Sequence, residues 1–271
     1  MSDDLAPLLE RARGGDRDSL ERLVERIQGP VLQLALRMLW HPEDARDAAQ
    51  EILIRIVTHL GSFRGESRVQ TWVYQIAANY LISARQSRVE ARRYTFDRFA
   101  RELEDGLADI GDEGEWPADK ALLLEEVKVG CMNGLLTCLD RPGRLAYILG
   151  EILELGGVEA ANILGISPAA FRKRLSRARS AVIAFTRAHC GLVDPANACR
   201  CARRLPVAQA MKRVNADALM FADAASARAF PATLDRIRRL DVVRRTAALY
   251  RSAPQPEAGQ ELLDRIRAIL E

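Results

Sequence analysis

The amino-acid sequence predicts an all-α protein, and three observations support this prediction. Apolar residues recur at helical spacing in almost every segment, whereas no alternating strand pattern of useful length appears. One segment, residues 160–179, reads as a helix, a glycine turn and a second, strongly basic helix. We therefore expect two small helical domains joined by an acidic linker and followed by a helical C-terminal extension. The expected parts are residues 1–95, 96–119, 120–188, a cysteine-rich segment at 189–205, and 206–271.

Composition restricts the class of protein more than its function. The 271 residues are 48% hydrophobic, so the chain can bury proper cores, and its net charge of +3 alone says nothing about nucleic acid. No apolar run of about 18 residues occurs, and the acidic start lacks the basic residues and apolar core of a signal peptide. Five cysteines without an export signal favour a reducing compartment. We expect a cytoplasmic protein with no membrane span.

Three apolar stripes predict the helices of the first domain. They run over residues 31–39, over 45–60 after Pro42 at the expected helix start, and over 72–81. The second helix carries a polar face that is either simply solvated or a protein contact. The exposed residues expected on that face are Asp47, Gln50, Glu51 and Arg55.

Between the second and third helices, aromatic residues alternate with cations. Phe63 and Trp72 are interleaved with Arg64 and Arg68, and Asn79 follows. Stacking surfaces beside cations are what single-stranded bases and their backbone require. The alternative is that the aromatic residues belong to the core.

A charge reversal separates the two domains. Residues 85–101 carry six arginines against two acids, whereas residues 102–119 carry eight acids and no base. The acidic segment has few apolar residues to anchor it, so we expect it to repel itself into an extended linker.

The second domain contains the expected helix-turn-helix. Gly165 stands where a helix ends in a left-handed residue, Ser167 can cap the next helix, and Pro168 fits its first position. No acid lies between Ala169 and Ser180, so the exposed face of this helix can meet phosphates and base edges in a major groove. The alternative is an ordinary solvated basic face.

A cysteine-rich segment follows. His189, Cys190, Cys199 and Cys201 lie within thirteen positions and make up a complete tetrahedral zinc set. Their spacing is not the paired Cys-x-x-Cys form, so one zinc ion, a redox-sensing thiol pair and a structural turn all stay open. Cys131 and Cys138 are expected in the core.

Three motifs, in this order, resemble the bacterial sigma-70 family, specifically the compact extracytoplasmic-function sigma factors. They are residues 42–51, Phe63-Arg-Gly65 with residues 72–79, and Gly165-Ile-Ser167 followed by residues 172–179. The resemblance covers about residues 20–93 and 120–188.

The resemblance implies a role for each motif. The helix at 44–55 would dock on the clamp helices of the largest subunit of core RNA polymerase, through Asp47, Gln50, Glu51 and Arg55. The following loop and helix would capture a flipped base of the −10 element, through Phe63, Arg64, Ser67, Arg68, Trp72 and Asn79. The basic helix would read the −35 element as duplex, through Ala169, Ala170, Arg172, Lys173, Arg174, Ser176, Arg177 and Arg179. The acidic linker would thread polymerase channels that otherwise take nucleic acid.

Some positions depart from the family pattern. The family often has Asp where this chain has Ser83 and Arg where it has Gln86. The recognition helix carries Ala169, Ala170 and Phe171 where the family commonly has small, hydroxyl and β-branched residues. These differences leave the promoter sequence open. The tail at 206–271 lies outside the two sigma domains and is either a solvated amphipathic helix or a fused regulator.

We therefore predict a sigma factor, which is not an enzyme, with core RNA polymerase and promoter DNA as partners. Its regulator would be an anti-sigma factor or its own extension, and no cofactor is expected beyond the zinc ion suggested at 189–201. One alternative is a stand-alone helix-turn-helix regulator, in which the helix at 44–55 and the acidic linker have no role. Another is a metal or redox sensor with the DNA domain as its output.

Overall fold

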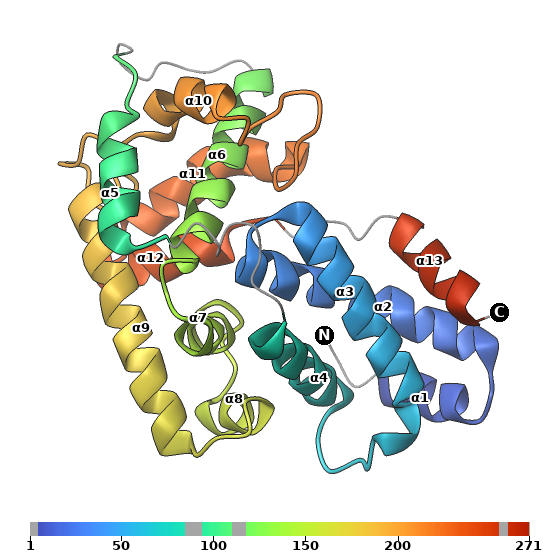
Figure 1. Ribbon diagram of the computed structural model, residues 1–271. Coiled ribbons are helices and arrows are strands. Elements are labelled where there is room, and N and C mark those ends of the chain that lie inside the picture. The colour runs from blue at the N-terminus through green and yellow to red at the C-terminus, as the bar shows by residue number, and fades with distance from the viewer. Residues whose placement is uncertain (1–4, 85–93, 110–117, 255–259, 271) are drawn as a thin grey trace. The chain divides into compact units, whose positions relative to one another are not determined.

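A computed structural model describes residues 5–84, 94–109, 118–254 and 260–270 (Figure 1). Over these ranges the chain forms helices and no β-strand. Cys190 and Cys199 form one isolated β-bridge. The all-α prediction is confirmed. In the same ranges, no helix has both the length and the apolar character needed to cross a membrane.

The chain divides into two compact units. Unit 1 comprises Met1–Ala91, Leu155–Lys173 and Pro256–Glu271, and unit 2 comprises Arg92–Glu154 and Arg174–Gln255. The C-terminal extension is therefore shared between the units rather than standing apart, because its last helix belongs to unit 1 and the helices before it belong to unit 2.

Unit 1 is built on two long antiparallel helices. Its helices are α1 (Leu5–Arg13), α2 (Arg17–Leu39), α3 (Pro42–Thr58), the short η1 (Leu60–Ser62), α4 (Val69–Ser83), α8 (Gly157–Ile163) and α13 (Gln260–Leu270). Asp16 caps α2, since its carboxylate accepts the hydroxyl of Ser19 at 2.6 Å and the Ser19 N–H at 3.4 Å. Small buried residues of α3, Ala45 and Ala49, lie in the core with Ala35 and Met38 of α2. Small side chains let helix backbones approach closely, which fits the extensive α2–α3 contact.

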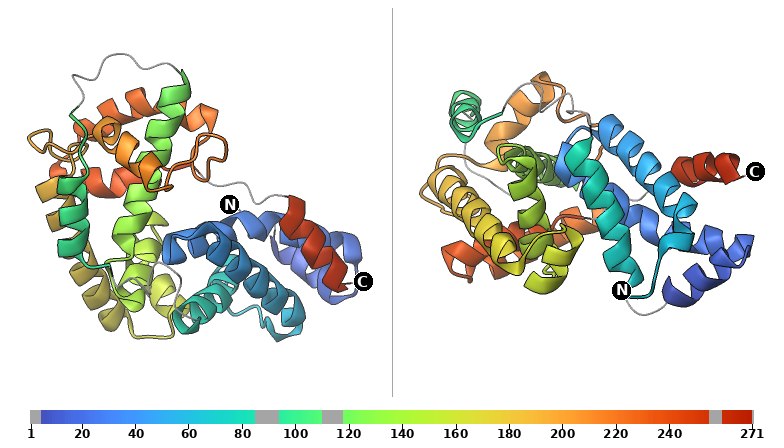
Figure 2. Two further views of the ribbon diagram at one scale, coloured as in Figure 1. Left: turned by 45° about the horizontal axis from the view of Figure 1, so that its top comes forward. Right: turned by 60° about the horizontal axis from the view of Figure 1, so that its bottom comes forward.

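Unit 2 is arranged around α6. Its helices are α5 (Phe96–Asp105), α6 (Ala118–Leu136), α7 (Arg141–Tyr147), the π-helical turn η3 (Ile148–Ile152), most of α9 (Pro168–His189), α10 (Cys201–Ala210), α11 (Ala224–Arg238) and α12 (Val242–Arg251). Helices α10 and α11 both pack on α6. Two views in Figure 2 show α6 among the helices of this unit.

Several buried charged side chains of unit 2 have partners within the chain, although Glu125 keeps one carboxylate oxygen without a hydrogen bond among the described residues. Lys128 pairs with Glu125 at 2.5 Å, with both side chains 1% exposed. Glu126 accepts the backbone N–H groups of residues 220–222 at 2.8–2.9 Å. Arg144, 2% exposed, donates to three carbonyl oxygens of residues 136–139. Such groups are costly when unpaired, so these contacts fix the extension and the start of α7 onto α6.

The segment at 96–119, which its charge predicts to be an extended linker, is not extended in its first part. Its first part is the helix α5, capped by Thr95, whose side chain accepts the Arg98 N–H. Phe99 and Leu103, four positions apart, are 2% and 3% exposed, and Phe99 packs on Phe185 of α9. The apolar pair on one face, rather than the total charge, decides the structure of residues 96–105. Residues 110–117 lie outside the described part of the chain.

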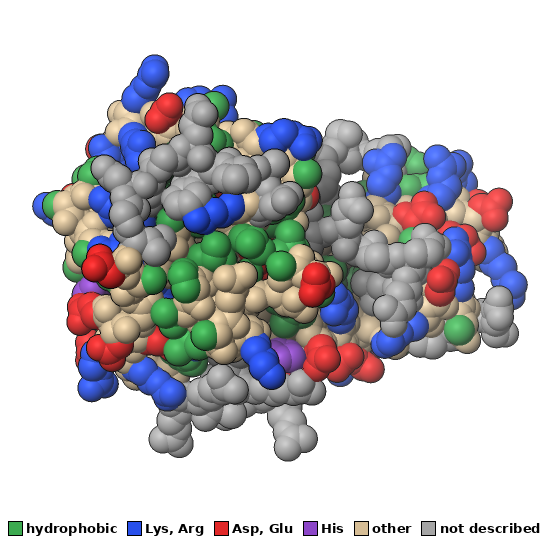
Figure 3. All heavy atoms as spheres, turned by 90° about the horizontal axis from the view of Figure 1, so that it is seen from above, with side chains coloured by type: hydrophobic (Ala, Val, Ile, Leu, Met, Phe, Trp, Pro, Cys, Tyr) green, Lys and Arg blue, Asp and Glu red, His purple; other side chains and the backbone are tan. Residues whose placement is uncertain are grey.

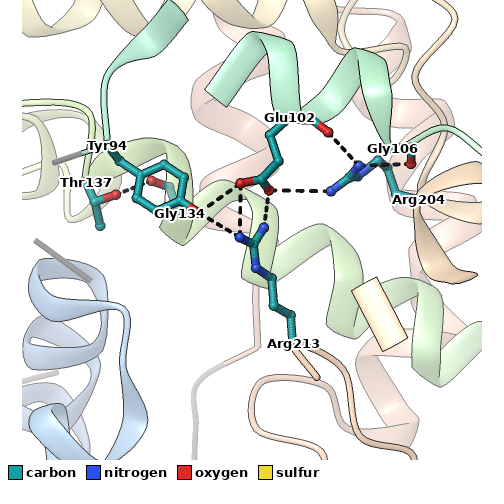
Figure 4. A network of polar contacts seen from close by, with 7 residues as sticks. All are labelled: Tyr94, Glu102, Gly106, Gly134, Thr137, Arg204 and Arg213. Carbon is teal, nitrogen blue, oxygen red and sulfur yellow. Dashed lines mark hydrogen bonds and ion pairs between the residues drawn. The ribbon is translucent and has the colours of Figure 1, made fainter. Parts of the chain in front are cut away.

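A polar network attaches α5 to the extension (Figure 4). Arg213 donates to both carboxylate oxygens of Glu102, and Tyr94 donates its hydroxyl to Glu102 at 2.8 Å. Arg204 donates to the carbonyl oxygens of Glu102 and Gly106, each at 2.9 Å. Arg204 of the cysteine-rich segment and Arg213 of the extension thereby both form ion pairs with Glu102.

On the face seen in Figure 3, acidic and basic side chains are interspersed around exposed hydrophobic ones. Neither sign of charge dominates that face. This agrees with the small net charge of +3. A surface that attracts anions would therefore be formed by the side chains of one helix rather than by the whole face.

Candidate nucleic-acid interface

The turn between α8 and α9 has the geometry of a helix-turn-helix. Gly165 has φ of +60°, a left-handed value that costs glycine little. Its N–H donates to the Asn162 carbonyl at 3.1 Å, and the next N–H, from Ile166, donates to the Ala161 carbonyl at 3.0 Å. This is the Schellman pattern of helix termination. The Ser167 hydroxyl then accepts the Ala170 N–H at 3.2 Å, so α9 begins one residue later at Pro168.

Helix α9 presents a cationic face at its N-terminal half. Phe171, Ala178 and Val182 recur at helical spacing and are buried, at 1%, 3% and 0% exposure, whereas Leu175 between them is half-buried. The residues expected to contact DNA are exposed or half-buried, namely Ala169, Ala170, Arg172, Lys173, Arg174, Ser176, Arg177 and Arg179. The cations on this face are therefore accessible to phosphates and base edges.

Arg179 differs from the other cations of α9. Its Nε donates to Glu151 at 3.0 Å, and a second guanidinium nitrogen also contacts that carboxylate. A carboxylate that already holds the guanidinium competes with a phosphate. Arg179 is thus the least available of the expected phosphate contacts.

The first helix of the motif packs on α4 within unit 1. The Thr71 hydroxyl donates to Glu159 at 2.6 Å, and the Gln75 side chain donates to the Asn162 carbonyl at 3.3 Å. Glu159 was not among the predicted site residues. An acidic residue in the first turn of a helix is common, because it interacts favourably with the helix dipole, so the sequence did not mark Glu159 as a contact to α4.

The loop between η1 and α4 is built from a buried aromatic pair and exposed cations. Phe63 and Trp72 are 7% and 9% exposed, with ring centroids 5.6 Å apart in an edge-to-face arrangement. The structure therefore places both rings in the core, whereas Arg64 and Arg68 are exposed, Ser67 is half-buried and Asn79 is exposed. Gly65, with φ of +72°, allows the loop to turn between them.

Two cavities flank this loop. One of about 620 Å³ is lined by Ser62–Ser67 residues, Trp72, Gln75 and the turn residues Gly165–Ser167. The other, of about 700 Å³, is lined by the loop together with the start of α1 and α4. Both have the size of small-molecule pockets, and Arg64 or Arg68 lines each of them.

The polar face of α3 is divided between two neighbours. Asp47, Glu51 and Arg55 are exposed, and the Arg55 guanidinium lies over the Tyr80 ring of α4 at 4.9 Å from its centroid. Burial and the nearby Glu51 carboxylate raise the pKa of the Tyr80 hydroxyl. Gln50 instead accepts a hydrogen bond from Arg265 of α13 at 3.2 Å. Sequence reasoning missed this contact, although Leu263 and Ile266 already gave α13 an apolar face.

The cysteine-rich segment does not assemble the four expected zinc ligands. Among the described residues, no group of three or more His, Cys, Asp or Glu side chains is placed to share a metal ion. His189 faces Glu104 at 3.5 Å and stacks on Phe185. Burial raises the pKa of the Cys190 thiol, and that of Cys199 to about 11. A protonated thiol is a weak nucleophile.

Comparison with known proteins identifies the family. Residues 23–90 match the family description Sigma-70 region 2. The chain is 32% identical over 188 residues to the ECF RNA polymerase sigma-E factor of Escherichia coli (strain K12). The alignment covers 67% of this chain and 95% of that protein. It is also 30% identical over 179 residues to the RNA polymerase sigma-H factor of Pseudomonas aeruginosa. That alignment covers 65% of this chain and 90% of that protein.

A solved structure of CnrH in complex with the cytosolic domain of CnrY aligns with a TM-score of 0.47 at 22% identity, covering 67% of this chain and 96% of that one. The curated relatives are matched over nearly their whole length, while about a third of this chain lies outside the alignment. This chain belongs to the extracytoplasmic-function sigma factors of the sigma-70 family.

Proposed function

We propose that this sigma factor binds core RNA polymerase and directs it to specific promoters, reading the −35 element with α9 and opening the −10 element with the loop at 60–67 and α4. The observation that carries the proposal is the exposed, acid-free basic face of α9, set directly after a Schellman turn in a chain of this family. Polymerase supplies the catalysis in this scheme, and the sigma factor supplies specificity and strand separation in the cytoplasm.

Duplex reading is assigned to the first turns of α9. Arg172 and Lys173 precede the other cations and are exposed, which supports their assignment to base edges in the major groove. Arg174 and Arg177 lie farther along the helix and suit phosphates, which fix its register. Ala169, Ala170 and Ser176 supply the small contact surface between the cations.

Strand capture is assigned to the loop and its two cavities. Arg64 and Arg68 are exposed where a nucleic-acid backbone would pass, and Ser67 and Asn79 provide polar groups beside them. Because Phe63 and Trp72 are buried against each other, their role is to hold the loop rather than to stack on bases. A base that leaves the duplex would enter one of the cavities, since an extruded base needs a pocket.

Polymerase binding is assigned to the polar face of α3. Asp47, Glu51 and Arg55 are exposed and held on a rigid helix beside Tyr80. Mixed acidic and basic side chains of this kind suit an electrostatically complementary protein surface. Gln50 belongs to the same proposed contact but is half-buried in the free chain.

The stand-alone regulator is not favoured, because the relatives are RNA polymerase sigma factors over the matched two thirds of the chain. The zinc ion suggested by the sequence at 189–201 finds no support in the geometry of the described residues. Metal analysis of the reduced protein tests it beside a variant with Cys190, Cys199 and Cys201 changed to serine. Stoichiometric zinc in the parent alone would reinstate that site.

Co-purification with core polymerase, followed by run-off transcription on genomic fragments, tests the proposed function. We expect the sigma factor to co-elute with the core enzyme and to yield transcripts from a defined subset of fragments that core alone does not transcribe. A protein that shifts duplex DNA strongly but neither binds core nor supports transcripts would instead be the stand-alone regulator.

A further inference from the structure

The last helix of the chain packs on the core of unit 1. Helix α13 contacts α3 and α2, and Figures 1 and 2 show it lying alongside them. Leu263 and Ile266, three positions apart and so on one side of the helix, are 7% and 3% exposed. The centre of this contact is therefore apolar, as in the docking of an amphipathic helix into a groove.

Two arginines fix α13 to both of its neighbours. Arg265 donates to Gln50 of α3 at 3.2 Å, and Arg267 donates to Glu21 of α2 at 3.0 Å. Asp264 accepts from Arg267 at 3.2 Å and orients it. Exposed hydrogen bonds and ion pairs add little affinity by themselves, so the arginines set the position of a helix that Leu263 and Ile266 anchor.

The face that α13 covers overlaps the face assigned to polymerase. Gln50, Ile54 and Val57 follow one another at helical spacing on one side of α3, and all three are half-buried. Asp47, by contrast, is exposed one turn before Gln50. A polymerase helix that contacts Gln50 needs the space that the Arg265 side chain takes in the free chain.

We propose that the α2–α3 face is a binding surface for amphipathic helices, and that α13 occupies it as an internal competitor of core RNA polymerase. The inference rests on the proposed polymerase contact at Gln50. Polymerase then binds only the fraction of molecules in which α13 is undocked, and the apparent affinity falls by that fraction. By linkage, polymerase binding weakens α13 docking by the same factor.

The primary test uses the full-length chain with Leu263→Asp and Ile266→Asp together. Charges at these buried positions undock α13, and we expect core polymerase to bind about ten-fold more tightly than it binds the parent. Ala268→Asp is the control for a carboxylate on this helix, because it adds one at an exposed position. Circular dichroism and the unfolding midpoint verify that the double variant keeps its fold. Parent-like affinity in a folded double variant would overturn the inference.

A second measurement follows α13 itself. Hydrogen exchange of the amides at 263–267 is expected to be slow in the free chain and to become faster when core polymerase is added. Unchanged protection in the complex would show that helix and polymerase do not compete, and would overturn the inference.

A charge swap tests the docked position without touching a residue assigned to polymerase. Arg267→Glu should raise the affinity for core, and adding Glu21→Arg should return it toward the parent value. An affinity that the second change leaves high would contradict the placement of α13 on α2.

A second double variant distinguishes failure of the proposed polymerase contact from failure of the competition by α13. If charge reversal at Glu51 and Arg55 leaves core binding unchanged, the polymerase face itself is misplaced and the inference falls with it. If that reversal weakens binding while the Leu263 and Ile266 variant behaves like the parent, only the competition by α13 is wrong.

Discussion

The carboxylate of Glu102 is held by the guanidinium of Arg213, which follows it by 111 positions in the chain. The pair joins α5 to the segment after α10 inside unit 2, and the Tyr94 hydroxyl completes it at 2.8 Å (Figure 4). Burial alone would raise the pKa of Glu102, but the hydrogen bonds from Arg213 and Tyr94 outweigh it. The pKa of Glu102 therefore lies below its ordinary value of 4.5.

This lowered pKa predicts how stability depends on pH. Because the folded chain favours the carboxylate, the pair stabilises unit 2 above about pH 4.5, and this stabilisation is lost as the pH falls through the folded-state pKa. Glu102→Gln should lower the free energy of unfolding at neutral pH by about 1–3 kcal/mol and reduce its decline on acidification. Urea unfolding at neutral and acidic pH measures both. Asp105→Asn, an exposed carboxylate of the same helix, is the control. An equal acid-induced decline in the Glu102 variant and the parent would contradict the prediction.

The left-handed residue of the helix-turn-helix predicts a site-specific cost of adding a Cβ. Gly165→Ala should lower the free energy of unfolding by about 1–2 kcal/mol, because φ of +60° strains an L-residue although no atom obstructs the new methyl. Gly130→Ala, inside α6 where the new Cβ would make an ordinary van der Waals contact with Phe221, should instead stabilise by about 0.5–1 kcal/mol. Chemical denaturation compares the two variants. A Gly165 variant as stable as the parent would speak against the strained turn.

Reading of the −35 element predicts different losses along α9. Arg172→Ala should cost about 1–3 kcal/mol on the preferred sequence and relax specificity at one base pair. Arg177→Ala should weaken binding to all sequences alike and reduce its salt dependence. Arg179→Ala should matter less, because Glu151 already holds that guanidinium. Holoenzyme binding across a set of −35 substitutions measures these effects, and a uniform loss in the Arg172 variant would refute its base contact.

The polar face of α3 predicts a loss of polymerase affinity without a loss of fold. Glu51→Lys combined with Arg55→Glu should weaken core binding at least about ten-fold, because charge patterns across an interface must be complementary. Both side chains are exposed, so the unfolding midpoint should change little. Charge reversal at Arg11, an exposed residue of α1, serves as the control. Co-elution of the double variant with core at parent affinity would show that polymerase binds elsewhere.

Local signals in the sequence were sufficient for the helix that begins at Pro42 and for the turn before α9. Pro42, Gly165 and Ser167 act through their own backbone and side-chain chemistry, so their roles follow from residue type and position. The buried stripe of α9 follows equally from spacing, since Phe171 and Ala178 repeat at the helical period. Information confined to a few neighbouring residues is what a sequence pattern reads well.

Contacts between distant segments could not be read in the same way. The charge of the acidic segment concealed α5, whose Phe99 finds an aromatic partner on α9 only in the folded chain. Phe63 and Trp72 look alike as base-stacking or core residues until their mutual packing is known. The contact of Arg265 with Gln50 joins positions 215 residues apart, for which neither sequence motif carries any signal.

The contact of Glu126 with residues 220–222 also orders events during synthesis of the chain. Glu126 is 1% exposed, and the three N–H groups that solvate its carboxylate are translated some 94 residues after it. Until Ala222 has been translated, the Glu126 carboxylate of α6 cannot accept all three of these hydrogen bonds. Unit 2 therefore reaches its final packing only after α9 has been translated, and a chain terminated before Met220 would leave that carboxylate without these three N–H donors.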